Sequence, residues 1–201
     1  MPKKTSLEAE KKRLSELLSI KAGYPFRGAV KEVKGGGVRV IQAKDISELG
    51  ELIIESAVET ELTGKRDADW LQAGDVLFIS KGQRNIACYI EQDWPNFTCS
   101  PSLFILRPYT KWKNKLNMQF IAWQLNQGPT QNYFKKTAEG SNQISIRKQT
   151  LADLVIGVPS LDKQNLIAKL YQDSVTEYNA LQALIKNRKQ QNNAIAADLL
   201  R

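Results

Sequence analysis

Residues 162–201 contain neither glycine nor proline, the two residue types that most readily interrupt a helix. Apolar side chains recur along this segment at spacings of three and four, as on one face of an α-helix. The pattern predicts one helix about 55–60 Å long, at about 1.5 Å per residue, which is longer than a domain of this size needs. Because its apolar stripe has to be covered, we expect it to pack on another chain or a second copy rather than on its own domain. The residues expected at that contact are Ile167, Leu170, Tyr178, Leu181, Leu184, Ile195 and Leu199.

The residues before Pro159 predict a domain of mixed strands and short helices. Two apolar runs, 76–80 and 86–90, flank a polar loop and predict a hairpin. Further strands are expected at 38–41, 103–106 and 142–146, and helices at 6–20 and 116–125. We therefore expect an α+β protein in two parts, a globular domain over residues 1–159 and a coiled-coil spacer and dimerisation helix over residues 160–201.

The composition removes several classes of chemistry. The chain has no histidine, which excludes histidine-based triads and histidine metal sites. Its two cysteines, Cys88 and Cys99, lack the spacing of a zinc site and are expected to be reduced thiols in a cytoplasmic protein. No apolar stretch reaches the roughly 18 residues of a spanning helix. We expect no metal, no cofactor and no membrane partner.

Charge is distributed unevenly along the chain. The net charge is +8, yet residues 41–80 hold 3 basic and 9 acidic residues. Residues 81–148 hold 10 basic residues against 3 acidic ones, with aromatic and amide side chains between them. That mixture fits a polyanion surface, because phosphates attract Lys and Arg while amides match base edges. A solvated basic face on a soluble domain is the simpler reading of the same composition.

The candidate polyanion contacts lie in three polar segments, of which the first could equally be a plain polar turn and the second a solvated helix cap. They are expected to combine cations for phosphates with amides and hydroxyls for base edges. The residues are Lys81, Gln83 and Arg84 in the hairpin loop, then Lys111, Trp112 and Lys113, and then Gln131, Lys135, Lys136, Ser141 and Asn142.

Two further sets of charged residues, one acidic and one basic, each allow two interpretations. Asp67, Asp69 and Asp75 could suggest carboxylate catalysis, but they stand in a turn-rich acidic stretch without a matched partner. We expect a substitution of Asp75 to harm folding rather than chemistry. The basic residues Lys186 and Arg188 of the long helix could contact a DNA backbone, or could be its solvated face.

Several short motifs occur in an order that resembles one family. Gly23-Tyr24-Pro25-Phe26-Arg27-Gly28 follows the opening segment, and residues 40–46 and 71–82 carry a strand–turn and a Gly-Asp-Val-Leu hairpin. Gly140-Ser141 precedes Ile144 and Ile146, and Pro159 begins a junction that continues through Leu161, Gln164, Ile167 and Ala168. In this order the motifs resemble the DNA-specificity subunit of type I restriction–modification systems.

The resemblance implies a non-catalytic protein that reads double-stranded DNA. A separate methyltransferase subunit would transfer the methyl group, and in a system that also cuts DNA a motor-nuclease subunit would cleave. The full-length subunit carries two recognition domains and two long helices, so this chain resembles half of one. Two copies would then pair through antiparallel helices and read an interrupted palindrome.

Two alternatives to that arrangement stay open. The chain could pair with a different half of a split subunit, which would give an asymmetric site. It could also be a basic-surface interaction or dimerisation protein that binds RNA or another acidic partner without reading duplex sequence.

Overall fold

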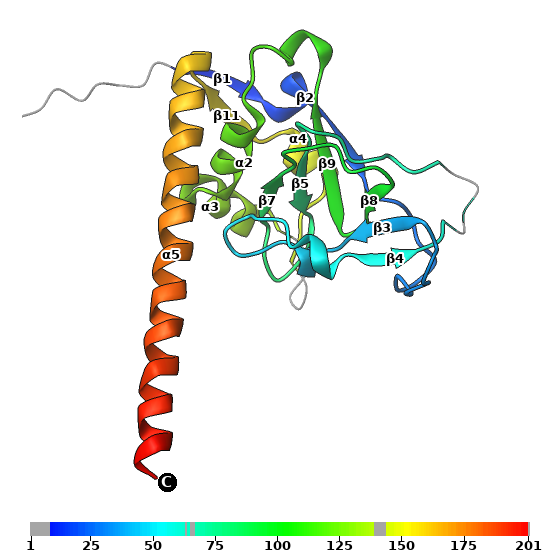
Figure 1. Ribbon diagram of the computed structural model, residues 1–201. Helices are drawn as coiled ribbons and strands as arrows, with labels where there is room; N and C mark the ends of the chain where they lie inside the picture. The colour runs from blue at the N-terminus through cyan, green and yellow to red at the C-terminus, as the bar shows by residue number, and fades with distance from the viewer. Residues whose placement is uncertain (1–8, 63, 65–66, 139–143, 201) are drawn as a thin grey trace, which may run out of the picture.

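Four antiparallel strands form the sheet on which the chain is built (Figure 1). Their order is β2 (Leu18–Ala22), β9 (Leu103–Pro108), β5 (Val76–Ile79) and β7 (Ala87–Tyr89). β5 and β7 pair antiparallel and form the hairpin that the sequence predicts. The structure is a computed structural model, and it describes residues 9–62, 64, 67–138 and 144–200.

The two central strands of this sheet are buried on both faces. Side chains alternate along a strand, so Val76 and Phe78 join one apolar cluster while Leu77 and Ile79 join another. β9 divides in the same way between the two clusters. A continuous apolar run is the sequence pattern of a strand covered on both sides, which is why these strands can be predicted without alternation.

A smaller sheet covers one face. β3 (Val38–Ile41) lies at its centre, antiparallel to β4 (Val58–Thr60) and parallel to β8 (Phe97–Cys99). The strand predicted over 38–41 is therefore confirmed. Two short 3-10 helices, η1 (Ala43–Asp45) and η2 (Ile54–Ser56), complete this layer.

Helices cover the other face. α2 (Met118–Asn126) is the helix predicted over 116–125, and the Asn117 side chain caps it by accepting a hydrogen bond from the Phe120 N–H at 3.0 Å. α3 (Gly128–Thr137) follows directly, with Pro129 in its first turn. The sequence analysis treated the residues after Pro129 as a polar segment, and this second helix is a correction to it. α4 (Lys148–Ala152) completes the layer.

The helix predicted over residues 6–20 is wrong for the part that the structure describes. Those residues form β1 (Glu10–Arg13), a single helical turn α1 (Leu14–Leu17), and β2. β1 pairs with β11 (Val155–Val158) and β2 pairs with β9, so both flanks gain interstrand hydrogen bonds. Tertiary pairing outweighs local helix propensity here, although the spacing of Leu14 and Leu17 still reflects the one turn that forms.

A buried ion pair joins two strands of the central sheet. The Arg107 guanidinium donates to both carboxylate oxygens of Asp75, each at 2.7 Å, and also to the Trp70 carbonyl oxygen at 2.9 Å. Asp75 is 1 % exposed, and its hydrogen bonds raise the pKa of the Arg107 guanidinium. The arrangement gives Asp75 a structural role, consistent with the expectation that its substitution harms folding.

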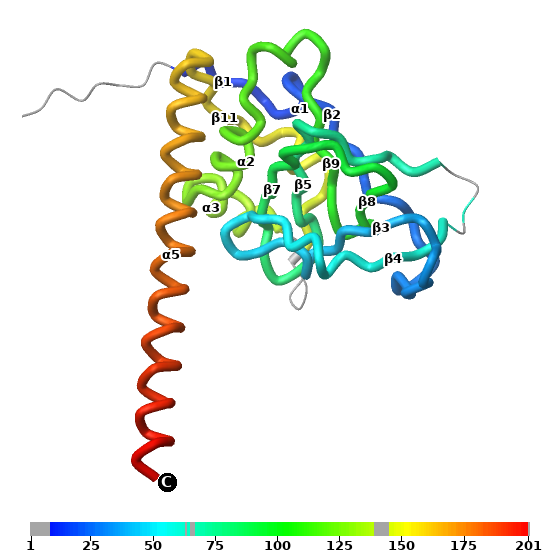
Figure 2. The backbone as a smooth tube through the Cα atoms, in the orientation of Figure 1, coloured from blue at the N-terminus to red at the C-terminus, as the bar shows by residue number. Residues whose placement is uncertain are grey.

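The long helix predicted from the sequence is α5 (Leu161–Leu199), which starts against the domain and continues beyond it (Figures 1 and 2). Its first turns pack through Gln164, Ala168 and Val175, all buried. Gln164 is 1 % exposed; its amide nitrogen donates to the carbonyl oxygens of Pro159 (2.9 Å) and Lys115 (3.2 Å). Its amide oxygen accepts from the Asn117 N–H at 2.9 Å. The expected α+β class, with one long C-terminal helix, is confirmed.

Replacing Gln164 by leucine should destabilise the domain by about 1–3 kcal/mol, because a buried N–H and two carbonyls would lose their partner. Urea unfolding followed by circular dichroism measures the change. Gln190→Leu, an exposed position on the same helix, is the matched control and should change the free energy of unfolding little. Equal stabilities for the two variants would show that Gln164 does not anchor the helix.

Candidate nucleic-acid interface

The antiparallel topology separates the candidate DNA contacts into two groups. β5 and β9 run in opposite directions with Ile79 opposite Leu103, so the loop that follows β5 and the turn that follows β9 lie at opposite ends of the sheet. The hairpin-loop residues therefore lie at one end. Lys111, Trp112 and Lys113, in and after η3 (Thr110–Trp112), lie at the other.

At the first end, two chain segments distant in sequence come together. β6 (Lys81–Gly82) pairs with β10 (Ile144–Ser145), with Lys81 opposite Ser145. The loop is held from within by Asn85, whose buried amide donates to the Ile79 carbonyl oxygen at 2.9 Å. Lys81 and Gln83 are exposed on this frame. Ser141 and Asn142, which the sequence analysis assigned to the same function, lie outside the described residues.

Arg84 is engaged with its own domain. Its guanidinium donates to the Ile46 carbonyl oxygen at 3.3 Å and lies 3.3 Å from a carboxylate oxygen of the exposed Glu48. A DNA contact through Arg84 would have to compete with both groups. The structure thus places Arg84 as a link between the hairpin loop and the turn at residues 46–48.

Gln131 is also committed to intramolecular contacts. Its amide nitrogen donates to the carbonyl oxygens of Asn85 and Leu125, each at 2.8 Å, which joins the first turn of α3 to the hairpin loop and to α2. Lys135 and Lys136 follow in the last turn of α3 and are exposed, a position where cations also complement the helix dipole. Among the described residues, neither lysine side chain has a hydrogen-bond or ion-pair partner.

Trp112 packs inward instead of presenting its ring to solvent. The indole N–H donates to the Glu16 carbonyl oxygen at 2.8 Å, and the Lys12 and Lys115 ammonium groups lie 5.4 Å and 5.9 Å from the ring centroid. Lys111 and Lys113 beside it are exposed. This end of the sheet therefore offers cations but no free aromatic surface from Trp112.

A basic loop that the sequence analysis did not select lies on the side of the domain away from α5 (Figure 1). Arg27, Lys31, Lys34 and Arg39 are all exposed, and none forms an ion pair within the described part of the chain. Gly35 and Gly37 adopt left-handed φ angles of 77° and 75°, which leaves the backbone between the cations open. Four basic residues against one acidic residue, Glu32, around the triple glycine is the signal that could have identified this loop.

The carboxylates considered for catalysis do not form a site. Asp75 is bound to Arg107, Asp69 pairs with Lys21, and Asp67 is exposed on the surface. Among the described residues, no group of three or more carboxylates and cysteines is placed to hold a metal ion. None of the described helices is long and apolar enough to cross a membrane.

α5 presents two different faces. At about 100° per residue, the domain-facing side chains and an outer set of side chains lie about 150° apart around the helix. We call the outer set the outer seam. Its members are Leu166, Leu170, Glu177, Leu181, Leu184, Arg188, Ile195 and Leu199. Its apolar members are 52–81 % exposed. Of the other residues expected at a dimer contact, Ile167 packs partly on its own domain and Tyr178 flanks the seam.

Known proteins share this architecture. Residues 7–192 match the family described as the type I restriction modification DNA specificity domain. No curated protein matches the sequence. The S subunit of a type I restriction–modification system from M. genitalium is 17 % identical, with a TM-score of 0.60 over 94 % of this chain and 45 % of that one. The HsdS subunit from Thermoanaerobacter tengcongensis is 16 % identical, with a TM-score of 0.60 over 90 % of this chain and 46 % of that one.

A third solved structure, described in terms of complex assembly and conformational transition of the type I R-M system, is 18 % identical, with a TM-score of 0.59 over 90 % of this chain and 42 % of that one. At these identities the likeness establishes the fold, and this chain spans less than half the length of each of the three. The family match, by contrast, runs from before β1 almost to the end of α5. The chain therefore belongs to the type I restriction modification DNA specificity domain family.

Proposed function

We propose that this chain is the DNA-reading half-subunit of a type I restriction–modification complex, acting as a homodimer and leaving the chemistry to partner subunits. One observation carries the proposal, which is that a domain with exposed basic loops is joined to a long helix whose second apolar face is uncovered. The division into a recognition domain, residues 1–159, and a spacer helix, residues 160–201, follows from this arrangement. The partners are double-stranded DNA, a methyltransferase subunit and, in a system that cuts, a motor-nuclease subunit, all in the cytoplasm.

The outer seam supports pairing with a second copy. An exposed stripe of leucine and isoleucine along a single helix is stabilised when another helix covers it. The seam is also symmetric in its spacing about the point between residues 182 and 183. Reversal about that point exchanges Leu166 with Leu199, Leu170 with Ile195, and Leu181 with Leu184. Two antiparallel copies would therefore place apolar residues opposite apolar residues.

The same reversal exchanges Glu177 with Arg188. An antiparallel pair would place these opposite charges together twice, once on each side of the two-fold axis. A parallel pair would place Glu177 opposite Glu177 and Arg188 opposite Arg188, which is unfavourable. Charge thus favours the antiparallel orientation, and that orientation gives the two-fold symmetry that matches a palindromic site.

The recognition domain offers two kinds of contact. Lys135 and Lys136 suit phosphates, as do Lys31 and Lys34, because an ammonium group acts there as a point charge. Arg27 and Arg39 can bind a phosphate through two guanidinium N–H groups at once. Gln83 has an exposed amide of the kind that pairs with base edges. Arg84 and Gln131 support the loop that carries Gln83.

The proposal is tested by copurification with the methyltransferase encoded beside this chain, followed by selection from randomised duplex DNA at near-physiological salt, because phosphate binding alone is salt-sensitive. We expect a stable complex and an enriched, interrupted palindrome. An enriched but asymmetric site would replace the homodimer by a pair of different halves. No complex and no enrichment would contradict sequence-specific readout.

Removing the lysines that bind phosphates should weaken binding to all duplexes alike. For Lys135→Ala/Lys136→Ala and for Lys31→Ala/Lys34→Ala, the slope of log K against log salt should fall by about 0.9 for each phosphate that the variant no longer neutralises. Fluorescence anisotropy with labelled duplexes at several salt concentrations measures this. Lys163→Ala/Lys169→Ala, exposed on α5, is the control pair. A pair whose salt slope matches that of the wild type does not contact DNA.

Cysteine cross-linking tests the helix orientation. A mixture of Glu177→Cys and Arg188→Cys chains should form a disulfide-linked dimer, whereas either variant alone should not, since like positions would lie about 16 Å apart. Self-cross-linking of each variant would instead establish a parallel pair. Gln190→Cys, off the seam, is the control. The native thiols should not interfere, because both are buried; burial raises the pKa of Cys88 to about 12 and also raises the pKa of Cys99.

A further inference from the structure

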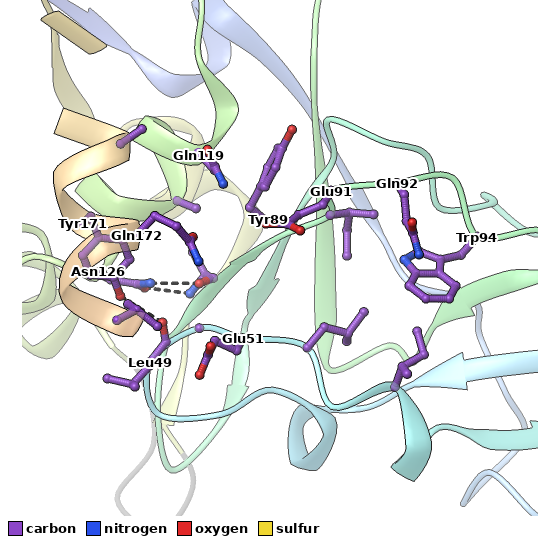
Figure 3. Close-up of a pocket in the computed structure, with 18 residues that line it drawn as sticks. Leu49, Glu51, Tyr89, Glu91, Gln92, Trp94, Gln119, Asn126, Tyr171 and Gln172 are labelled. Atoms are coloured by element: carbon purple, nitrogen blue, oxygen red, sulfur yellow. Dashed lines mark hydrogen bonds between the residues drawn. The ribbon is translucent and has the colours of Figure 1, made fainter. Parts of the chain in front are cut away.

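A groove on the flank of α5 remains unexplained by DNA reading or by helix pairing. It has a volume of 390 Å³ and lies between α5, α2, the segment 49–54 and the end of β7 (Figure 3). Apolar side chains line its base, among them Leu52, Ile54 and Ile90. A second hollow of 560 Å³ shares Tyr89 and Gln119 with it.

Some polar groups around this groove are already engaged, whereas others have no partner among the described residues. Glu51 accepts hydrogen bonds from the Asn179 amide at 3.0 and 3.3 Å, and the Tyr171 hydroxyl donates to the Leu49 carbonyl oxygen at 2.9 Å. Gln119 on α2 and Gln172 on α5 line it, and within the described residues neither side chain makes a hydrogen bond. The same holds for the Tyr89 hydroxyl and the Glu91 carboxylate. Figure 3 shows these side chains coming from separate elements around the hollow. An amide side chain can both donate to and accept from a peptide backbone.

The charge of the groove is negative, although the chain as a whole is positive. Glu51 and Glu91 line it. Their effect reaches the aromatic hydroxyls, because burial and then Glu91 raise the pKa of Tyr89, while burial and then Glu51 raise the pKa of Tyr171. Trp94 and Tyr89 also line the groove, and aromatic rings together with carboxylates favour a cationic side chain. Phosphate would be repelled.

The second copy in the proposed dimer does not cover this groove. Gln172, which lines it, lies about 150° around α5 from the outer seam. An antiparallel partner helix on the seam would therefore lie on the far side of α5. A partner helix on the seam would therefore leave the groove accessible.

We propose that this groove is the docking site for a segment of the partner protein that carries a lysine or an arginine. In the proposed function, that partner is the methyltransferase subunit. The cation would lie between the carboxylates of Glu51 and Glu91, and its apolar stem would contact the rings of Tyr89 and Trp94. The backbone of the peptide would form hydrogen bonds with the two glutamine amides. This proposal rests on the proposed function for the identity of the partner. The groove's preference for a basic peptide does not depend on it.

The test uses Glu91→Lys, because Glu91 is exposed and its side chain makes no hydrogen bond or ion pair within the described residues. The variant should bind the methyltransferase about tenfold or more weakly, since like charges would then meet across the interface. It should keep the cross-linking pattern of the outer seam. Asp67→Lys, an exposed charge reversal outside the groove, is the matched control and should bind as the wild type does. Equal binding by Glu91→Lys and wild type would overturn the proposal.

If the wild type forms no complex with the methyltransferase, the proposed function fails and a direct titration decides the groove. The probes are an acetylated, amidated peptide of alternating alanine and arginine, and its alanine–glutamate counterpart, followed by calorimetry. Binding of the arginine peptide alone, weakened in Glu91→Lys, supports the site. Binding of neither peptide, or equal binding by the wild type and Glu91→Lys, overturns it.

Discussion

The buried amide of Gln164 determines how the long helix leaves the domain. It satisfies the Asn117 N–H that begins α2 and two carbonyls on either side of the junction. Only an uncharged side chain with both a donor and an acceptor can do this in a buried position without leaving a group unpaired. The direction of α5 depends on this side chain, and in the proposed homodimer so would the distance between the two domains. A coiled-coil spacer can act as a ruler only if its start is rigid.

The sequence predicts those elements whose pattern is set by burial alone. β5 and the first four residues of β9 are apolar throughout, and α5 has no interrupting residue, so each follows from composition and period. The opening segment does not, because its strands exist only through partners more than 80 residues away in β9 and β11.

The candidate interface residues also divide into those that the sequence predicts and those that depend on the fold. Exposed lysines can be predicted from the sequence, whereas the intramolecular bonds of Arg84 and Gln131 depend on loops brought together by the fold.

The net charge of +8 conceals two surfaces of opposite sign. The basic loop at residues 27–39 lies on the side of the domain away from α5, whereas Glu51 and Glu91 line the groove beside α5. Acidic residues close to a DNA-reading surface weaken phosphate binding, so their position beside the helix separates the two kinds of contact. Of the acidic residues in the stretch 41–80, Glu51 is the one that lines this groove.

The polar pair in the outer seam bears on the choice between the two assemblies open to this chain. Glu177 and Arg188 interrupt an otherwise apolar contact, and charges at such positions cost stability relative to leucine. Their cost is offset when the two groups meet, which in a homodimer happens only in the antiparallel orientation. Because the seam spacing is symmetric under the same reversal, one sequence supplies both halves of its own complement. A pair of unlike halves would need no such symmetry within either chain, so the seam favours the homodimer.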